Sequence, residues 1–154
     1  MNGRSALARQ AHVATSVWVR LLKAHGLLLR EVRRRVPAPL TLPQFDVLAQ
    51  LHRRGARTPG ELTRELLVTA GNITGIIERL VRMGLVSRHP VPEDGRAVRV
   101  QLTARGRQLM GKAIPRHRRD VAALLSVLPA GELRQLRLLL GTLGEELQAR
   151  AETQ

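Results

Sequence analysis

Polar side chains that could recognise a nucleic acid stand in two short stretches of the sequence. Asn72, Thr74 and Arg79 lie in a segment where apolar residues recur every three or four positions. Asp94 and Arg96 flank a glycine in the turn-forming sequence PEDGR. Asparagine can pair with adenine, arginine with guanine or a phosphate, and threonine with a thymine methyl group or a phosphate. These residue types favour hydrogen bonding to base edges and to a phosphate backbone.

The first stretch has the pattern of an amphipathic helix over residues 70–83, capped by Thr69 and ended by Gly84. Its apolar stripe repeats at the i, i+3, i+4, i+7 spacing of a buried face and consists of Ile73, Ile76, Ile77 and Leu80. The opposite face carries Ala70, Asn72, Thr74, Gly75, Glu78, Arg79 and Arg82. Because a helix fits the major groove, we expect this face to contact DNA, with Gly75 permitting close approach. The alternative is an ordinary solvated helix face.

The second stretch predicts a β-hairpin. Two β-prone runs, 85–91 and 97–103, enclose PEDGR, and Val98, Val100 and Leu102 alternate with polar residues in the second run. An arginine at a hairpin tip can enter a narrow minor groove, where the negative potential is strongest. We therefore expect Arg96 to contact the minor groove, Asp94 to orient it, and Arg88 and Arg99 to contact phosphates. A local salt bridge in the turn is the alternative.

Two further helices must position these elements. Thr58, Pro59 and Glu61 form a capping-box pattern that predicts a helix over 59–67. Only about two residues separate it from the helix over 70–83, which is the outline of a helix-turn-helix. A helix over about 43–55 precedes it, with Phe45, Leu48 and Leu51 as its buried residues and Arg53, Arg54 and Arg57 as further candidates for phosphate contacts.

Long leucine-rich helices are predicted at both ends of the chain, over 6–36, 104–128 and 131–149. The predicted fold class is mainly α, an α+β winged helix with six helices and a two-stranded β-wing. The terminal helices carry more leucine than one small domain needs, which favours a dimer interface over a closed monomeric bundle. The predicted division is a dimerisation helix at 1–36, a DNA-binding lobe at 37–103 and dimerisation helices at 104–154.

Composition limits the function classes. The 154 residues contain 26 Lys plus Arg against 12 Asp plus Glu, a formal net charge of +14, and only Lys23 and Lys112 are lysines. A polyanionic partner fits this balance, although genome composition can also enrich arginine. No apolar run reaches the ~18 residues of a membrane span, no secretory signal is evident and cysteine is absent, so we expect a cytoplasmic protein without disulfides.

Nothing in the sequence indicates an enzyme. The five histidines show no metal-ligand spacing, and there is no phosphate-binding glycine loop, cysteine nucleophile or paired carboxylate. We therefore expect no catalytic residues, no metal and no cofactor.

Together these elements resemble the MarR family of bacterial winged-helix transcriptional regulators. The resemblance runs from VWVRLLKAHG through LTLPQFDVLAQLHR and LLVTAGNITGIIERLVRMGLVSR to EDGRAVRVQLTARG and the closing helices. It implies a homodimer, repression from a pseudo-palindromic operator, and release by a small aromatic carboxylate or phenolic effector. A ligand-insensitive regulator and a winged helix that binds an acidic protein are the alternatives.

The effectors of the family often bind between the dimerisation helices and the DNA-binding lobe. Trp18 and His25 lie two turns apart on the first predicted helix, and Arg116 and His117 lie on the fifth. An aromatic wall with cationic groups suits an aromatic carboxylate, so these four are the candidate effector residues. Core packing for Trp18 and a surface position for the histidines are the alternatives.

Overall fold

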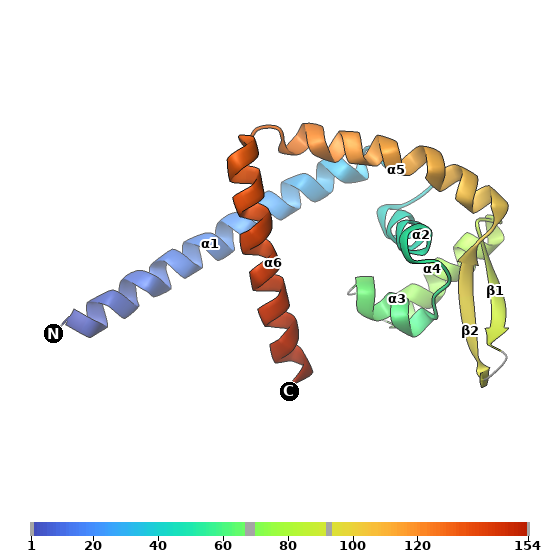
Figure 1. Cartoon of the computed structure of the whole chain (residues 1–154), viewed down its shortest axis with the longest axis horizontal. Helices are drawn as coiled ribbons and strands as arrows, with labels where there is room; N and C mark the ends of the chain where they lie inside the picture. Colours follow the sequence, from blue (N-terminus) through green and yellow to red (C-terminus); the bar gives the residue numbers. More distant parts are fainter. Residues whose placement is uncertain (1, 67–69, 92–93, 154) are drawn as a thin grey trace. The chain divides into compact units, whose positions relative to one another are not determined.

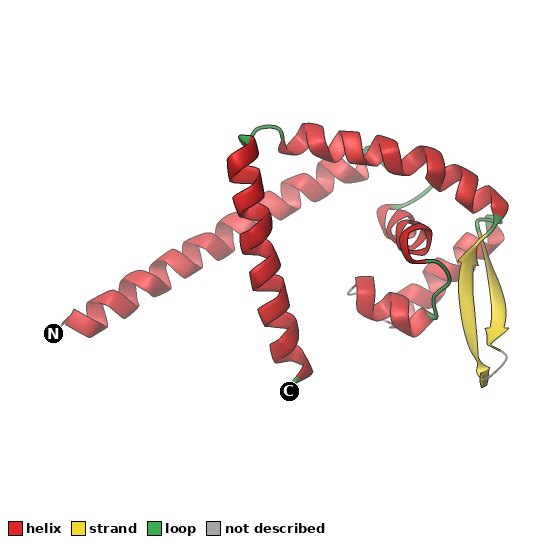
Figure 2. Ribbon diagram, in the orientation of Figure 1, coloured by secondary structure: helices red, strands yellow, loops and turns green. Residues whose placement is uncertain are grey.

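The computed structural model describes residues 2–66, 70–91 and 94–153 (Figure 1). Its elements follow the order α1 (Asn2–Arg33), α2 (Leu42–Arg54), α3 (Pro59–Leu66), α4 (Ala70–Arg82), β1 (Val86–Val91), β2 (Asp94–Leu102), α5 (Ala104–Leu125) and α6 (Ala130–Glu152). The predicted fold class, six helices with a two-stranded wing, is confirmed for the described part of the chain (Figure 2). None of the helices in that part is both long and apolar enough to cross a lipid bilayer.

The helix α1 ends at Arg33, three residues before the predicted end at Val36. The chain turns there, with the amide of Arg35 donating to the carbonyl of Val32 at 3.0 Å. Pro37 and Pro39 follow, which the helix could not have accommodated in its interior. Several large apolar side chains of α1 remain open to solvent, namely Val13, Val17, Trp18, Val19, Leu22 and Leu27.

The capping box of α3 is present as predicted. The amide of Thr58 donates to the Glu61 carboxylate at 2.7 Å, and the amide of Glu61 donates to the Thr58 hydroxyl at 3.2 Å. Pro59 opens the helix, where its missing N–H costs no intrahelical bond. These residues fix where the helix-turn-helix begins.

The helix α4 buries the predicted stripe and ends at Arg82, and the turn after it contains Gly84. Gly84 has a φ of 67°, a left-handed conformation that glycine adopts without strain. The amide of Leu85 donates to the carbonyl of Leu80 at 3.0 Å and the amide of Gly84 to that of Val81 at 2.8 Å. The side chain of Leu85 is buried, so the glycine turn passes the chain directly from α4 into the wing.

The strands β1 and β2 pair antiparallel, with Val86 opposite Leu102 and His89 opposite Arg99. Val100 and Leu102 are buried as the alternation predicted, whereas Val98, nearer the tip, is 36% exposed. The sequence did not reveal a further pairing: Arg57 exchanges both backbone hydrogen bonds with Val100, at 3.0 and 2.7 Å. This bridge ties the base of the wing to the start of α3.

The start of α5 is fixed to the end of α4. The Thr103 hydroxyl donates to the Gly84 carbonyl at 2.7 Å and accepts from the Gly106 amide at 3.1 Å. Met110 and Ala113 of α5 are part of the hydrophobic core formed with α2, α3, α4 and the wing. Figure 1 shows these elements grouped together. The main buried residues of this core are Phe45, Val47, Leu48, Leu62, Ile73, Ile77, Leu80, Val100 and Met110.

The chain divides into two compact units, residues 1–117 and 118–154. The first holds α1, the winged helix and the first part of α5, and the second holds the rest of α5 with α6. Four apolar residues at the end of α5 and just after it are only half-buried: Val121, Leu124, Leu125 and Leu128. Most of the large apolar side chains of α6 are exposed, namely Leu136, Leu138, Leu139, Leu140, Leu143 and Leu147.

Candidate nucleic-acid interface

The helix α4 has two chemically different faces. Ile73, Ile76, Ile77 and Leu80 are at most 4% exposed and hold the helix against the core. The other face presents polar side chains to solvent, and Gly75 lies among them half-buried. The exposed residues of this face are Asn72, Thr74, Glu78, Arg79 and Arg82. Packing on one face therefore fixes which side chains of α4 can reach a partner.

Pairing of the strands places Arg88 and Arg99 on opposite faces of the hairpin. Arg88 lies opposite the buried Val100 and so shares the face that turns toward the helices, while Arg99 lies opposite His89 on the other face. Both arginines are exposed.

The outer face of the wing holds a small polar cluster that sequence reasoning missed. The His89 ring nitrogen Nε2 lies 2.9 Å from the Ser87 hydroxyl and 2.8 Å from Nε2 of Gln101. Residues 87, 89 and 101 lie on the same face of the two paired strands, and that register is the signal that could have grouped them.

Three of the predicted DNA-binding residues fall outside what the structure describes in full. Thr69 lies outside the described residues. Asp94 and Arg96 lie within β2, but their side chains are outside the described part. Their predicted roles at the cap and at the tip of the wing stay predictions.

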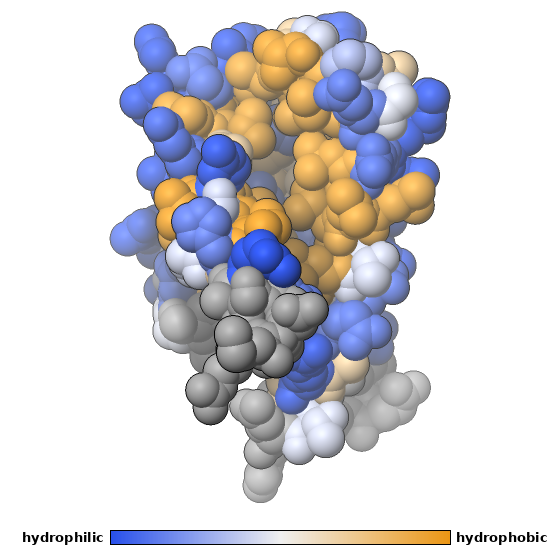
Figure 3. Space-filling view, turned by 90° about the vertical axis from the view of Figure 1, so that its left-hand side faces the viewer, coloured by the Kyte–Doolittle hydropathy of each residue, from blue (hydrophilic) through white to orange (hydrophobic). Residues whose placement is uncertain are grey.

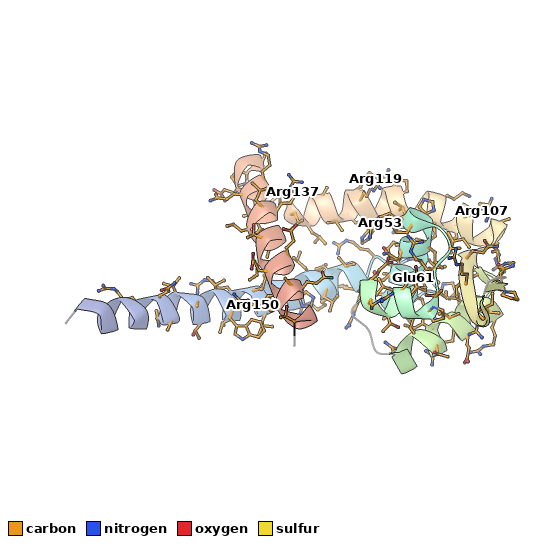
Figure 4. All side chains as sticks on the ribbon, turned by 60° about the horizontal axis from the view of Figure 1, so that its bottom comes forward. Arg53, Glu61, Arg107, Arg119, Arg137 and Arg150 are labelled. Atoms are coloured by element: carbon orange, nitrogen blue, oxygen red, sulfur yellow. The ribbon has the colours of Figure 1, made fainter. Side chains whose placement is uncertain are left out.

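Two of the arginines before α3, Arg53 and Arg57, have partners within the chain. Arg57 lies 3.4 Å from the Glu65 carboxylate and donates to the Ala56 carbonyl at 2.8 Å. The Gln50 side chain donates to Glu65 and accepts from Arg53 at 2.7 Å. This network joins α2 to α3, so Arg57 has a structural partner in addition to its predicted phosphate role. Figure 4 labels Arg53 on α2 and Glu61 on α3.

Electrostatics favour the charged form of Glu61. The hydrogen bond from the Thr58 amide holds the pKa of this carboxyl below its usual value, and Arg57 and Arg99 add charge attraction in the same direction. Glu61 thus remains an anion under ordinary conditions and faces the N-terminus of α3, where a negative charge is stabilising.

The effector candidates lie on two helices, α1 and α5. Trp18 is 58% exposed on α1, and His25 on the same helix is also exposed. On α5, Arg116 is exposed, whereas the ring of His117 packs against Phe45 with centroids 4.9 Å apart and planes tilted by 52°. His117 therefore takes part in the contact between α5 and α2.

Asp46 stands beside this contact. Partial desolvation by the surrounding residues raises the pKa of the Asp46 carboxyl. The charge of His117 acts in the opposite direction and lowers this pKa. Among the described residues, no group of three or more His, Asp or Glu side chains is placed to hold a metal ion.

Comparison with known proteins matches this arrangement. The model of the MarR family matches residues 38–97. The HTH-type transcriptional regulator PecS of Dickeya dadantii is 32% identical over 111 residues, which cover 70% of this chain and 67% of PecS.

Solved structures share the fold. A mutant of MarR from E. coli complexed with operator DNA has a TM-score of 0.73 and 31% identity, covering 80% of this chain and 91% of that one. BpsR of Bordetella bronchiseptica, whose DNA binding is regulated by 6-hydroxynicotinic acid, has a TM-score of 0.77 and 26% identity, covering 84% and 98%.

Proposed function

The chain belongs to the MarR family of HTH-type transcriptional regulators, and we propose that it acts as a homodimeric repressor of a pseudo-palindromic operator, released by a small aromatic anion. Family membership makes it a DNA-binding regulator with a winged helix-turn-helix and not an enzyme. The residues that read the operator, the dimer and the effector are parts of the proposal.

One observation carries the DNA-binding surface: the polar face of α4 is exposed directly opposite a fully buried stripe. A helix anchored in this way can lie in the major groove with its N-terminal residues nearest the base edges. We assign Asn72 and Thr74 to base edges and Arg79 to a guanine or the backbone one turn further on. Gly75 would let the helix approach closely, and Thr69, which lies outside the described residues, remains the predicted cap of the helix.

The wing supplies the second contact. We place Arg96 in the minor groove beside the recognised bases, with Asp94 orienting it, because narrow A·T-rich grooves attract guanidinium groups. Arg88 and Arg99, on opposite faces of the hairpin, would hold phosphates on the two walls of the groove.

Exposed apolar surface supports the dimer. Leu136, Leu140, Leu143 and Leu147 follow one another on α6 at intervals of four, three and four residues, the spacing of a helix–helix seam. All four are at least 36% exposed in the single chain, and hydrophobic surface open to solvent is visible in Figure 3. We propose that segments 1–36 and 104–154 form the dimer and that 37–103 contacts DNA.

The effector is proposed from chemistry and from the related BpsR, whose DNA binding responds to a heteroaromatic acid. Trp18 offers an aromatic surface, and His25, Arg116 and His117 offer groups that can bind a carboxylate. The ring of His117 also packs against Phe45 of α2. An effector that contacts His117 could therefore shift α2 through this contact.

Selection of bound sequences from random double-stranded oligonucleotides, followed by footprinting, tests the proposal. We expect an inverted repeat whose half-sites are about 10 base pairs apart centre to centre, protected as one unit. Binding without sequence preference would favour a module that grips acidic proteins. Half-sites occupied independently would contradict the dimer while leaving the recognition helix in place.

A further inference from the structure

A cationic surface covers the outer side of the first half of α5. Residues 104–119 contain six Lys and Arg residues and no Asp or Glu. Three of the six, Arg105, Lys112 and Arg116, follow one another at intervals of seven and four residues, so they lie within about 40° of one another around the helix axis. All three side chains are exposed, whereas Met110, on the opposite side of the helix, is buried in the core.

A fourth cation joins this surface from α4. Arg82, the last residue of α4, lines the same surface hollow as Arg105 and Lys112, and no acidic residue among those described lines it. Nη1 of Arg105 lies 3.8 Å from the position that a Cβ atom of Gly84 would occupy, which places its guanidinium beside the end of α4. The α5 patch is defined here as Arg82, Arg105, Lys112 and Arg116, and it lies wholly within the unit of residues 1–117.

Three charges of the α5 patch are not neutralised within the described part of the chain. Among the described residues, Arg82, Arg105 and Lys112 have no hydrogen bond and no ion pair. Like charges that share one surface repel each other, and a polyanion lying across them would relieve that repulsion. The patch therefore offers positive charge to a partner and does not hold α5 in place.

The composition of the α5 patch favours a nucleic acid over a protein as its partner. The centre of a protein–protein interface is depleted in charged residues and enriched in aromatic ones, whereas a nucleic-acid interface is polar and positively charged. No large apolar side chain of residues 104–117 is exposed. A second copy of this chain is also a poor partner for the patch, because two identical cationic surfaces repel each other.

The length of the α5 patch fits a phosphate backbone. Arg105 and Arg116 are eleven residues apart, which is about 17 Å along a helix that rises 1.5 Å per residue. One strand of duplex DNA carries a phosphate about every 3.4 Å along its axis, so about five phosphates pass over this length. Arginine can bind phosphate oxygens with two parallel hydrogen bonds, and lysine binds them as a point charge.

The α5 patch faces away from the proposed recognition surface. In Figure 1, α5 runs along the upper edge of the winged helix, while α3 and the lower ends of the strands lie toward the opposite edge. Met110 and Ala113 turn the inner side of α5 toward the core, so the patch lies on the outer side. This arrangement favours a second duplex over the one that α4 and the wing would contact.

We propose that the α5 patch binds the phosphate backbone of a second double-stranded DNA segment. This inference rests on the proposed function, in which α4 and the wing occupy the first duplex. Binding at the patch has no sequence preference, because contacts to phosphates do not read the bases. A regulator bound to its operator would thereby hold a second stretch of DNA beside it.

Capture of a second duplex tests the inference. An operator duplex is immobilised and saturated with the full chain, and a labelled duplex that lacks the operator is then added. We expect saturable capture of the labelled duplex, with an affinity that falls with salt at a logarithmic slope of about −3.6, the value for four phosphate contacts. Occupancy of the operator is measured first, so operator binding without capture would overturn this inference and leave the proposed function standing.

A triple variant locates the second duplex on α5. Arg105→Gln/Lys112→Gln/Arg116→Gln should weaken capture at least about tenfold and make the salt slope shallower by about 2.7, the value for three lost phosphate contacts. Operator affinity should change less than about threefold, because charges beyond a Debye length are largely screened. Unchanged capture, or an equal loss of capture and of operator affinity, would overturn the proposal.

A matched triple variant on α1 is the control for net charge. Arg9→Gln/Lys23→Gln/Arg30→Gln removes the same formal charge from exposed positions of another helix and should change capture less than about threefold. Equal losses of capture in the two triple variants would mean that the net charge of the chain attracts the second duplex, and this result would contradict a site on α5.

A charge reversal repeats the test away from the turn after α4. Arg105 lies beside Gly84 in that turn, whereas Lys112 and Arg116 lie further along α5 at exposed positions. Lys112→Glu/Arg116→Glu should therefore leave thermal unfolding nearly unchanged and abolish capture, because its carboxylates repel the phosphates. Capture that persists in this folded variant would overturn the inference.

Discussion

At the scale of single residues, Gly106 is a position where only glycine fits. A Cβ atom there would overlap the carbonyl oxygen of Leu85 and lie 3.1 Å from its carbonyl carbon. That carbonyl is fixed because it accepts the Thr103 amide at 3.1 Å. We expect Gly106→Ala to lower the free energy of unfolding by about 1–3 kcal/mol, the range for overpacking a core. Urea unfolding followed by circular dichroism measures the change.

Gly111, on the same helix α5, is the control. Nothing lies within 4 Å of a Cβ built there, so Gly111→Ala should stabilise the helix by about 0.5–1 kcal/mol. The two alanine variants should therefore shift the unfolding midpoint in opposite directions. Equal shifts would mean that helix propensity, and not the Leu85 carbonyl, decides both positions.

The recognition residues predict two different losses of DNA binding. Asn72→Ala should relax base choice within the half-sites and cost about 1–3 kcal/mol if the amide pairs with adenine. Arg96→Ala should weaken binding mainly where A·T-rich positions flank the half-sites. Fluorescence anisotropy with a panel of operator variants separates these patterns. Unchanged affinity and preference in both variants would move the DNA surface away from α4 and the wing.

At the scale of elements, the capping box of α3 predicts a pH dependence. Thr58→Ala should cost about 0.5–2 kcal/mol of stability, the usual range for a lost N-cap. The pKa of Glu61 lies below its ordinary 4.5 in the folded chain, so its carboxylate stabilises the fold above that pH. This contribution is lost as the pH falls through the lower folded value.

Glu61→Gln tests that contribution because it keeps an acceptor but removes the charge. The difference in unfolding free energy between the native chain and the variant should be largest at neutral pH and shrink as the pH falls below 4.5 and through the lowered pKa of folded Glu61. Urea titrations at several pH values measure it. A difference that stays constant with pH would show that the charge of Glu61 adds nothing to the cap.

Elements with a local signal could be predicted from the sequence, and contacts between distant segments could not. The stripe of α4, the box at Thr58 and the glycine at 84 are fixed by neighbouring residues, and all three are confirmed. The bridge between Arg57 and Val100 and the fit at Gly106 depend on segments far apart in the sequence. No sequence periodicity indicates such contacts, because each depends on where the backbone of a distant segment lies.

The candidate site divides in the same way. Amphipathic spacing sufficed to predict which side of α4 is exposed. The internal pairing of Arg57 with Glu65 and the packing of His117 on Phe45 required the fold, because an arginine or histidine pattern does not reveal which partner it meets.

At the scale of the whole molecule, the exposed leucines of α6 predict the oligomeric state. Leu140→Glu should place a charge in the proposed seam and shift the chain from dimer to monomer, since desolvating an unpaired carboxylate costs several kcal/mol. Light scattering after gel filtration measures the mass. The affinity for operator DNA should fall when the dimer is lost, because a monomer binds one half-site and makes about half the contacts.

Leu138→Glu is the matched control for the seam. It makes the same change on the same helix, but at 100° per residue position 138 faces nearly opposite to position 140. Leu138 is 63% exposed, and this variant should remain dimeric. A dimer that survives Leu140→Glu, or that is lost equally in both variants, would contradict a seam along positions 136, 140, 143 and 147.

If an effector releases the DNA, its binding site and the DNA-binding surface must be coupled reciprocally. Trp18 is the only tryptophan and the chain has no tyrosine, so its emission reports on α1. An aromatic carboxylate such as 6-hydroxynicotinate that binds beside Trp18 should change this emission and weaken operator binding over the same concentration range. Linkage then requires that operator DNA weaken effector binding by the same factor, typically about 5- to 150-fold.

His25→Ala should reduce effector affinity and leave the DNA affinity of the effector-free protein nearly unchanged. An effector that releases DNA but binds equally to the native chain and to the His25 and Arg116 variants would place its pocket away from these residues.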